Sequence, residues 1–218
     1  MNRAAKRRRH SAATTEATGV IVGQLRRRAT LADEPSVADV VAAVHGIPYG
    51  RPATRTISGV LAYWKGTCST KHLLLVAVLL ELWPETEPRL VHRVYRILPA
   101  EAQRFGDDVA ACVPPEGLVD IHRYCVIRMG GADVAVDITF PGTPAWSGHS
   151  SMELQCGQGE DHPVMGDPDI EKRALETRFC DPTVREPFIA ALSRHHFPGR
   201  PGNAAVRAAT LESADSAS

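Results

Sequence analysis

The longest apolar stretch of the chain, residues 73–80, follows a turn of small residues and one cysteine in "KGTCSTKHLLLVAVLL". On a helical projection, its apolar side chains cover every side, which is typical of a helix enclosed by other elements. We expect this helix to start near Thr67 or Cys68 and to end before Pro84. Because Glu81 interrupts the run well short of the ~18 to 20 residues that cross a bilayer, a buried helix is expected rather than a membrane span.

Other patterns predict further helices. "SVADVVAAVHGIPYG" begins with Ser36 as a capping residue, continues with valines at helical spacing, and stops at Gly46. "DPDIEKRALETRF" has Asp167 as a cap and Pro168 in the first turn. A last helix is expected near "EPFIAALSRHH" and a short one around 100–111, whereas the stretch between Gly46 and the cysteine is expected to be a linker.

Three segments predict β-strands. "RLVHRVYRIL" is one, and "DIHRYCVIRM" and "ADVAVDITF" flank the pair Gly130–Gly131. Two strands separated by a two-residue glycine loop are a strong indication of a β-hairpin. The sequence therefore predicts an α+β fold with an antiparallel sheet.

The hairpin also sets which side chains share a face. With the two glycines in the turn, Cys125 lies opposite Val136 on a mostly apolar face. On the other face, His122 lies opposite Thr139 and diagonal to Asp137, a neighbour about 7 to 8 Å away at the backbone and within reach of a long side chain. A one-residue slip would separate the two and disrupt the apolar face. The register therefore predicts a His122–Asp137 pair, which would also explain a carboxylate in the middle of an apolar strand.

Charge is distributed unevenly, although the chain carries 25 basic and 25 acidic side chains in all. Residues 1–30 hold eight basic side chains and one acidic one. We expect a basic, mostly disordered tail over 1–34, with at most weak contact to a polyanion, and a second disordered tail over 199–218. A dedicated nucleic-acid-binding domain is not expected, because the body between the tails is acidic. That body, residues 35–198, is expected to be one domain with a core over 36–140 and a helical and loop-rich extension over 141–198.

The five cysteines are odd in number and irregularly spaced, and no apolar segment of a secretory signal follows the basic N-terminus. A disulfide framework is therefore not expected. We expect the thiols to be reduced and the protein to be cytoplasmic. We expect no membrane partner and no cofactor.

One of these thiols is placed to react. At the start of a helix, the unpaired N–H groups and the helix dipole favour the thiolate form of Cys68. A neighbouring imidazolium from His122, oriented by Asp137, would lower the pKa of the thiol further. The Cys68 N–H would face a developing oxyanion, and Gly66 would let a substrate approach the backbone closely. Such a thiolate–imidazolium pair is suited to acyl transfer.

The "GTC" at the start of a buried helix, a histidine on one strand and "DIT" on the next resemble the transglutaminase-like superfamily over residues 36–140. The resemblance implies a papain-like core in which a central, buried, cysteine-bearing helix packs on an antiparallel sheet. It also implies Cys68 as nucleophile, His122 as acid and base, and Asp137 as the orienting group, with Trp64 shaping the cleft or the oxyanion site. Eukaryotic members have tryptophan after the cysteine where this chain has Ser69, so protein crosslinking is not inferred.

The resulting prediction is a thiol-dependent enzyme that transfers the acyl group of an amide or peptide-type substrate through a thioester on Cys68. The acceptor would be water or an amine, and the substrate a small molecule or a peptide. The alternative is a catalytically inactive transglutaminase-like module that serves binding or assembly and carries a basic tail.

Other constellations compete with this triad. Cys68 and His72 lie four residues apart and could form a local dyad on one helix face, beside a solvated or cleft-edge Lys71. His92 and the thiols Cys112 and Cys125 are expected to be structural. A metal site is not expected, because the remaining candidates match no zinc spacing: Cys156, His162, Cys180, His195 and His196.

Overall fold

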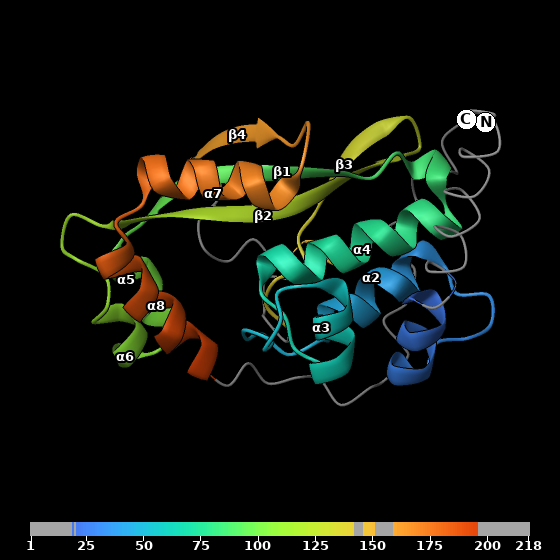
Figure 1. The fold of residues 1–218 in the computed structure, drawn as a ribbon, viewed down its shortest axis with the longest axis horizontal. Coiled ribbons are helices and arrows are strands. Elements are labelled where there is room, and N and C mark those ends of the chain that lie inside the picture. The colour runs from blue at the N-terminus through green and yellow to red at the C-terminus, as the bar shows by residue number, and fades with distance from the viewer. Residues whose placement is uncertain (1–18, 20, 142–145, 151–158, 196–218) are drawn as a thin grey trace, which may run out of the picture.

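The computed structural model describes residues 19, 21–141, 146–150 and 159–195 (Figure 1). Within them the fold is a mixture of helices and one antiparallel sheet, which confirms the predicted α+β class. The strands are β1 (Arg89–Ile97), β2 (Leu118–Met129), β3 (Ala132–Val136) and β4 (Gly159–Pro163), in the order β3-β2-β1-β4. No helix in the described part is long and apolar enough to cross a membrane. Residues 1–18 of the tail expected over 1–34, and the whole tail expected over 199–218, lie outside the described residues.

The β2–β3 hairpin has the predicted register at its turn. Met129 pairs with Ala132 and Cys125 with Val136, while Gly130 and Gly131 adopt the positive φ angles of 56° and 78° that a glycine turn accommodates. The ladder stops at Val136, however, because the next N–H, that of Asp137, donates to the carbonyl of His149 instead. The expected pairing of His122 opposite Thr139 within the ladder is therefore wrong.

Helix α4 (Cys68–Leu82) begins and ends where the sequence predicts, with Thr67 as its N-cap and Pro84 just beyond it at the start of the 3₁₀ turn Pro84–Thr86. It packs with α2 (Val37–His45), which Ser36 caps, and with the apolar face of the hairpin. Four of its apolar side chains are fully buried and others only partly, while Leu80 is 52% exposed, so α4 is not enclosed on every side as its pattern predicted. The buried residues contributed to this core by α4 and the hairpin segment are Leu74, Leu75, Val78, Leu79, Cys125, Ile127, Val136 and Ile138.

Two segments expected to lack regular structure contribute to the same core. Residues 21–29 are helical and bury Val22 and Leu25, so the disordered tail expected up to residue 34 is wrong from residue 21 onward. Apolar side chains at helical spacing, hidden among arginines in the sequence, explain the difference. Helix α3 (Ile57–Tyr63), capped by the Thr56 side chain, replaces part of the expected linker.

A second apolar cluster joins the helices at the left of Figure 1. These are α5 (Pro99–Ala102), α6 (Asp107–Ala110) and α8 (Pro182–Arg194), with the 3₁₀ turn Gln103–Phe105 between the first two. Its aromatic residues are Tyr49, Tyr95, Phe105, Phe140 and Phe188.

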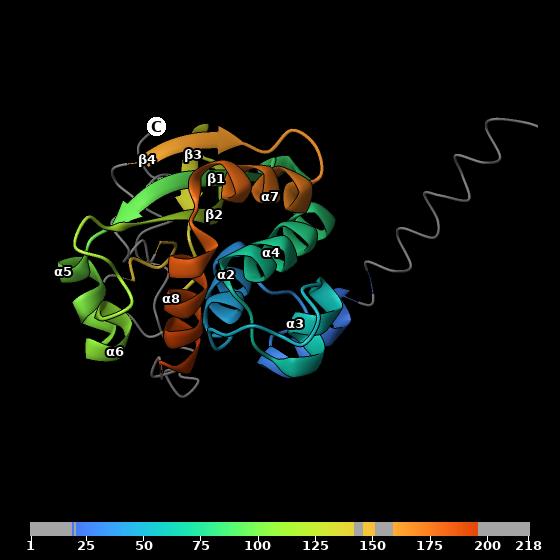
Figure 2. The same ribbon diagram turned by 60° about the vertical axis from the view of Figure 1, so that its left-hand side comes forward.

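The C-terminal part is more regular than expected. Helix α7 (Pro168–Phe179) is capped by Asp167 as predicted, and β4 forms where a loop was expected. Figure 2 shows α7 alongside the sheet and next to α4, with α8 following it toward the other helices. The N-terminus of α4 therefore faces a wall made by α7 and α8.

Candidate active site

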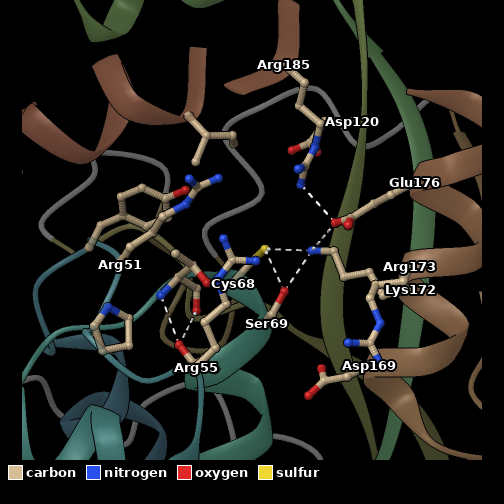
Figure 3. Close-up of a pocket in the computed structure, with 15 residues that line it drawn as sticks. Arg51, Arg55, Cys68, Ser69, Asp120, Asp169, Lys172, Arg173, Glu176 and Arg185 are labelled. Carbon is tan, nitrogen blue, oxygen red and sulfur yellow. Dashed lines mark hydrogen bonds and ion pairs between the residues drawn. The ribbon is translucent and has the colours of Figure 1, made fainter. Parts of the chain in front are cut away.

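Cys68 is the first residue of α4 and is partly buried at the wall of a cavity of about 250 Å³ (Figure 3). The N–H of Thr67 is bonded to the Thr70 hydroxyl at 3.1 Å, which fixes the turn into the helix. The N–H groups of the first helical turn have no carbonyl partner within the helix. Cys68 thus combines access to a cavity with the electrostatic environment of a helix N-terminus.

His122 on β2 and Asp137 just after β3 are both buried, with the His122 Nε2 atom 3.0 Å from the Asp137 Oδ2 atom. The other carboxylate oxygen accepts hydrogen bonds from the N–H and the hydroxyl of Thr139, at 3.0 and 2.5 Å. Burial favours the neutral acid, but the charge and hydrogen bond of His122 and the Thr139 bond hold the pKa of Asp137 well below its usual range. Asp137 is therefore an ionised, oriented partner for His122.

His122 also acts on the pKa of the Cys68 thiol and thereby links the cysteine to Asp137. Burial raises the pKa of Cys68, whereas the ammonium of Lys172 and the hydrogen bond and charge of His122 lower it, with a net fall to about 6. The Lys172 Nζ atom lies 3.7 Å from the sulfur. Half of the Cys68 groups are then thiolates near pH 6.

The other cysteines contrast with Cys68. Burial raises the pKa of Cys125 to about 12 and that of Cys180 to about 11. The Cys112 thiol donates to the carbonyl of Asp108 one turn earlier. These three are free thiols, whereas Cys156 lies outside the described residues.

The local dyad of Cys68 and His72 is excluded by the hydrogen bonds of the His72 ring. Its Nε2 atom accepts the Ile138 N–H at 3.1 Å, so the Nδ1 atom carries the proton and donates to the Cys68 carbonyl at 2.7 Å. Burial lowers the pKa of His72 to about 3 despite the Asp137 charge, 3.6 Å from its Nε2 atom. His72 is neutral and links α4 to the segment after β3 by two hydrogen bonds, so neither of its nitrogens is available to the thiol.

Lys71 is fully buried, so the expectation of a solvated or cleft-edge cation is wrong. Its ammonium donates to the carbonyls of His45, Ile47 and Thr139 at 2.9, 2.9 and 3.0 Å. Burial lowers the pKa of Lys71 to about 7, although the Asp137 charge acts in the opposite direction. Three acceptors at one ammonium tie the start of α4 to two other segments that border the site.

The two tentative substrate residues lie outside the cavity lining. Trp64 caps α3, packs against the apolar core and has the Arg28 guanidinium 5.0 Å above its ring. Gly66 is buried, and a Cβ atom there would come within 2.8 Å of the Lys71 Cγ atom and 2.9 Å of the Thr70 hydroxyl. Its lack of a side chain thus accommodates the chain's own helix rather than a substrate.

Arg123 is fully buried on β2 and connects three elements by hydrogen bonds. Its Nε atom donates to the His92 Nε2 atom at 3.0 Å, so His92 does have a partner, and its Nη1 atom donates to the Ser69 carbonyl at 3.2 Å. Its Nη2 atom reaches the Pro168 carbonyl at 2.5 Å and the Asp169 carboxylate at 2.9 Å. Arg123 thereby docks the start of α7 against β2 and α4.

Lys172 is the functional residue that sequence reasoning missed. It is buried on α7 and donates to the Ser69 hydroxyl at 2.7 Å while approaching the Cys68 sulfur (Figure 3). Behind it, Arg185 of α8 bonds to Asp120 at 2.5 Å and to Glu176 at 2.9 Å. No local motif distinguishes this lysine from other helical lysines; only the docking of α7 brings it to the thiol.

Of the residues considered as metal ligands, Cys156 and His196 lie outside the described residues. Within the described part, no three histidine, cysteine or acidic side chains gather as a metal site would require. Comparison of the chain with protein-family models, with curated proteins and with solved structures finds no match.

Proposed function

We propose that this chain is a thiol-dependent acyl-transfer enzyme with Cys68 as nucleophile, His122 as general acid and base, and Asp137 as the orienting residue. The observation that carries the proposal is the position of His122, which lies 3.0 Å from Asp137 and lowers the pKa of the Cys68 thiol. The same three roles occur in the papain-like core of the transglutaminase-like superfamily, which the chain resembles in these residues. A pKa near 6 for a cavity-lining thiol supports the role of nucleophile.

The first half-reaction follows from the contacts. The Cys68 thiolate attacks the carbonyl carbon of an amide, and the carbonyl oxygen becomes an oxyanion beside the first-turn N–H groups of α4. The His122 imidazolium donates its proton to the departing amine, and a thioester remains on Cys68. In the second half-reaction His122 takes a proton from water or from an acceptor amine, which attacks the thioester and restores the thiolate. A cavity of about 250 Å³ is suited to a small molecule or to one or two residues of a peptide.

The decisive experiment is to trap the acyl-enzyme with 4-nitrophenyl butyrate. We expect a burst of about one equivalent of nitrophenolate and, after an acid quench, one butyryl group located on Cys68 by mass spectrometry. Cys68→Ala should lose both signals, and Cys112→Ala, which removes a thiol outside the cavity, should keep them.

An unacylated Cys68 in folded protein would overturn the proposal and leave the inactive binding module as the remaining alternative. Equal acylation of Cys68 and Cys112 would also overturn it, since it would show that the cavity does not activate the thiol.

A further inference from the structure

The charges that line the cavity do not balance. Its wall carries five cationic side chains but three acidic ones, together with a few apolar groups such as Pro52 and Ile189. The cationic residues are Arg51, Arg55, Lys172, Arg173 and Arg185, and the acidic ones are Asp120, Asp169 and Glu176.

All three acidic side chains already have cationic partners. Asp120 and Glu176 bind Arg185 at 2.5 and 2.9 Å. Asp169 binds Arg123, which is fully buried behind the wall and is not part of the lining, at 2.9 Å. The three acidic groups of the lining are therefore already engaged by Arg185 and Arg123.

Arg55 and Arg173 are the arginines left over. Both are exposed, and neither guanidinium forms an ion pair with another residue in the described part of the chain. In Figure 3 the Arg55 side chain lies on one side of Cys68, and α7 with Arg173 lies on the other. The nearby Arg51 is bound to Glu186 at 2.7 Å. Two guanidinium groups that form no ion pair in the described part of the chain thus line the same cavity as the reactive thiol.

We propose that Arg55 and Arg173 form an anion subsite and that the acyl substrate of Cys68 carries a carboxylate or phosphate that binds there. This inference rests on the proposed function, because it names the substrate class for the same thiol. A guanidinium presents a planar pair of N–H donors that fits either oxyanion. A cleft lined by one sign of charge also concentrates ligands of the opposite sign. A substrate with a cationic group near the scissile bond would be repelled.

Two alkylating agents that differ by one charge test the subsite. Iodoacetamide and iodoacetate both transfer a two-carbon group to the thiolate and release iodide, but only iodoacetate carries a carboxylate. We expect the iodoacetate-to-iodoacetamide rate ratio to be higher at Cys68 than at Cys112 in the same protein. Each of Arg55→Gln and Arg173→Gln should lower that ratio about two- to fivefold, the size expected for one exposed charge pair. The ratio is unaffected by any change in the fraction of thiolate, because both agents react with the same Cys68 thiolate.

Arg178→Gln is the matched control, because Arg178 is on the same helix but outside the cavity lining. Its ratio should equal that of the wild type. Glutarate and inorganic phosphate are then tested separately as protectants of Cys68 against iodoacetamide. Protection by glutarate indicates a carboxylate ligand, and protection by phosphate indicates a phosphate ligand.

Failure of this inference can be told apart from failure of the proposed function. If iodoacetamide modifies Cys68 no faster than Cys112, the thiol is not activated and both fall. The anion subsite alone is overturned if Cys68 reacts selectively but its iodoacetate-to-iodoacetamide rate ratio matches that of Cys112. The same conclusion follows if the ratio is unchanged in the Arg55→Gln, Arg173→Gln double variant. In both cases the proposed thiol enzyme stands.

Discussion

The two walls of the cavity are held in place by different forces. On one wall, α4 carries Cys68 and is anchored by an apolar core shared with α2 and the β2–β3 hairpin. On the other wall, the residue of α7 that is buried is a lysine, Lys172, and the helix is docked by polar contacts. These are the hydrogen bonds of Arg123 to Pro168 and Asp169 and that of Lys172 to Ser69.

This difference separates two properties of the site. The apolar wall positions the reactive atoms, because close-packed side chains resist displacement. The polar wall controls the charge around those atoms, because its side chains are ionised and approach the sulfur directly. Substitutions on the two walls should therefore affect different observables.

The largest effect is expected within the triad. His122→Ala removes the group that accepts and donates the proton, so the rate of butyryl transfer from 4-nitrophenyl butyrate should fall by about 10²- to 10⁴-fold. His72→Gln should retain most of the rate per folded molecule, since both His72 nitrogens already bind backbone groups. If His72→Gln loses the butyryl-transfer rate while His122→Ala retains it, the base is His72 rather than His122.

Next in size is the ion-pair network behind the polar wall. Arg185→Met leaves Asp120 and Glu176 without their guanidinium partner, and the side chains of Arg185 and Asp120 are only 12% and 7% exposed. We expect a loss of about 2 to 3 kcal/mol in the free energy of unfolding, measured in urea. Arg194→Met, an exposed position on the same helix, should change the free energy by less than about 0.5 kcal/mol. Equal losses in the two variants would mean that the network contributes nothing specific.

A smaller change is expected from Lys172→Met, which removes the cation 3.7 Å from the sulfur. The pKa of Cys68 should rise from about 6 by roughly one unit, the size of a single close charge in a partly screened site. Alkylation by iodoacetamide should then slow several-fold at pH 6 and remain unchanged at pH 9, where the thiol is ionised in both proteins. Lys65→Met, outside the cavity, serves as the control; a uniform loss at all pH values in Lys172→Met would indicate a structural effect instead.

The last expected effect, similar in size, is on the pH dependence of stability. Burial lowers the pKa of His72 to about 3. Between about pH 6.5 and pH 3, His72 is therefore protonated in the unfolded chain but neutral in the folded chain. Its contribution to stability is thus complete above pH 6.5 and is lost as the pH falls toward 3. From pH 7 to pH 5 we expect His72 to account for about 1 to 2 kcal/mol of the loss. His72→Gln should flatten the curve by that amount, and an unchanged slope would show that His72 is protonated in the fold.

The parts of the fold that were predictable are those governed by local pattern. The hairpin register followed from two glycines between strands with alternating faces, and the start of α4 from a small-residue turn before an apolar run. Together they anticipated that His122 and Asp137 would meet, even though β3 ends before the pairing that was used to argue it. Helix 21–29 and α3 were missed because their apolar patterns are short and are surrounded by polar residues.

The fold class, the helix that presents Cys68 and the pairing of His122 with Asp137 could thus be predicted from local pattern, because backbone periodicity and turn chemistry act over a few residues. The charges that surround the thiol depend instead on how distant segments pack together. Lys172 is 104 residues from Cys68, and α7 has no apolar stripe that would indicate its docking face. Lys71 and His72 likewise acquired their roles from carbonyls and N–H groups of distant segments. The direction and range of such polar contacts depend on the finished fold, so no local pattern encodes them.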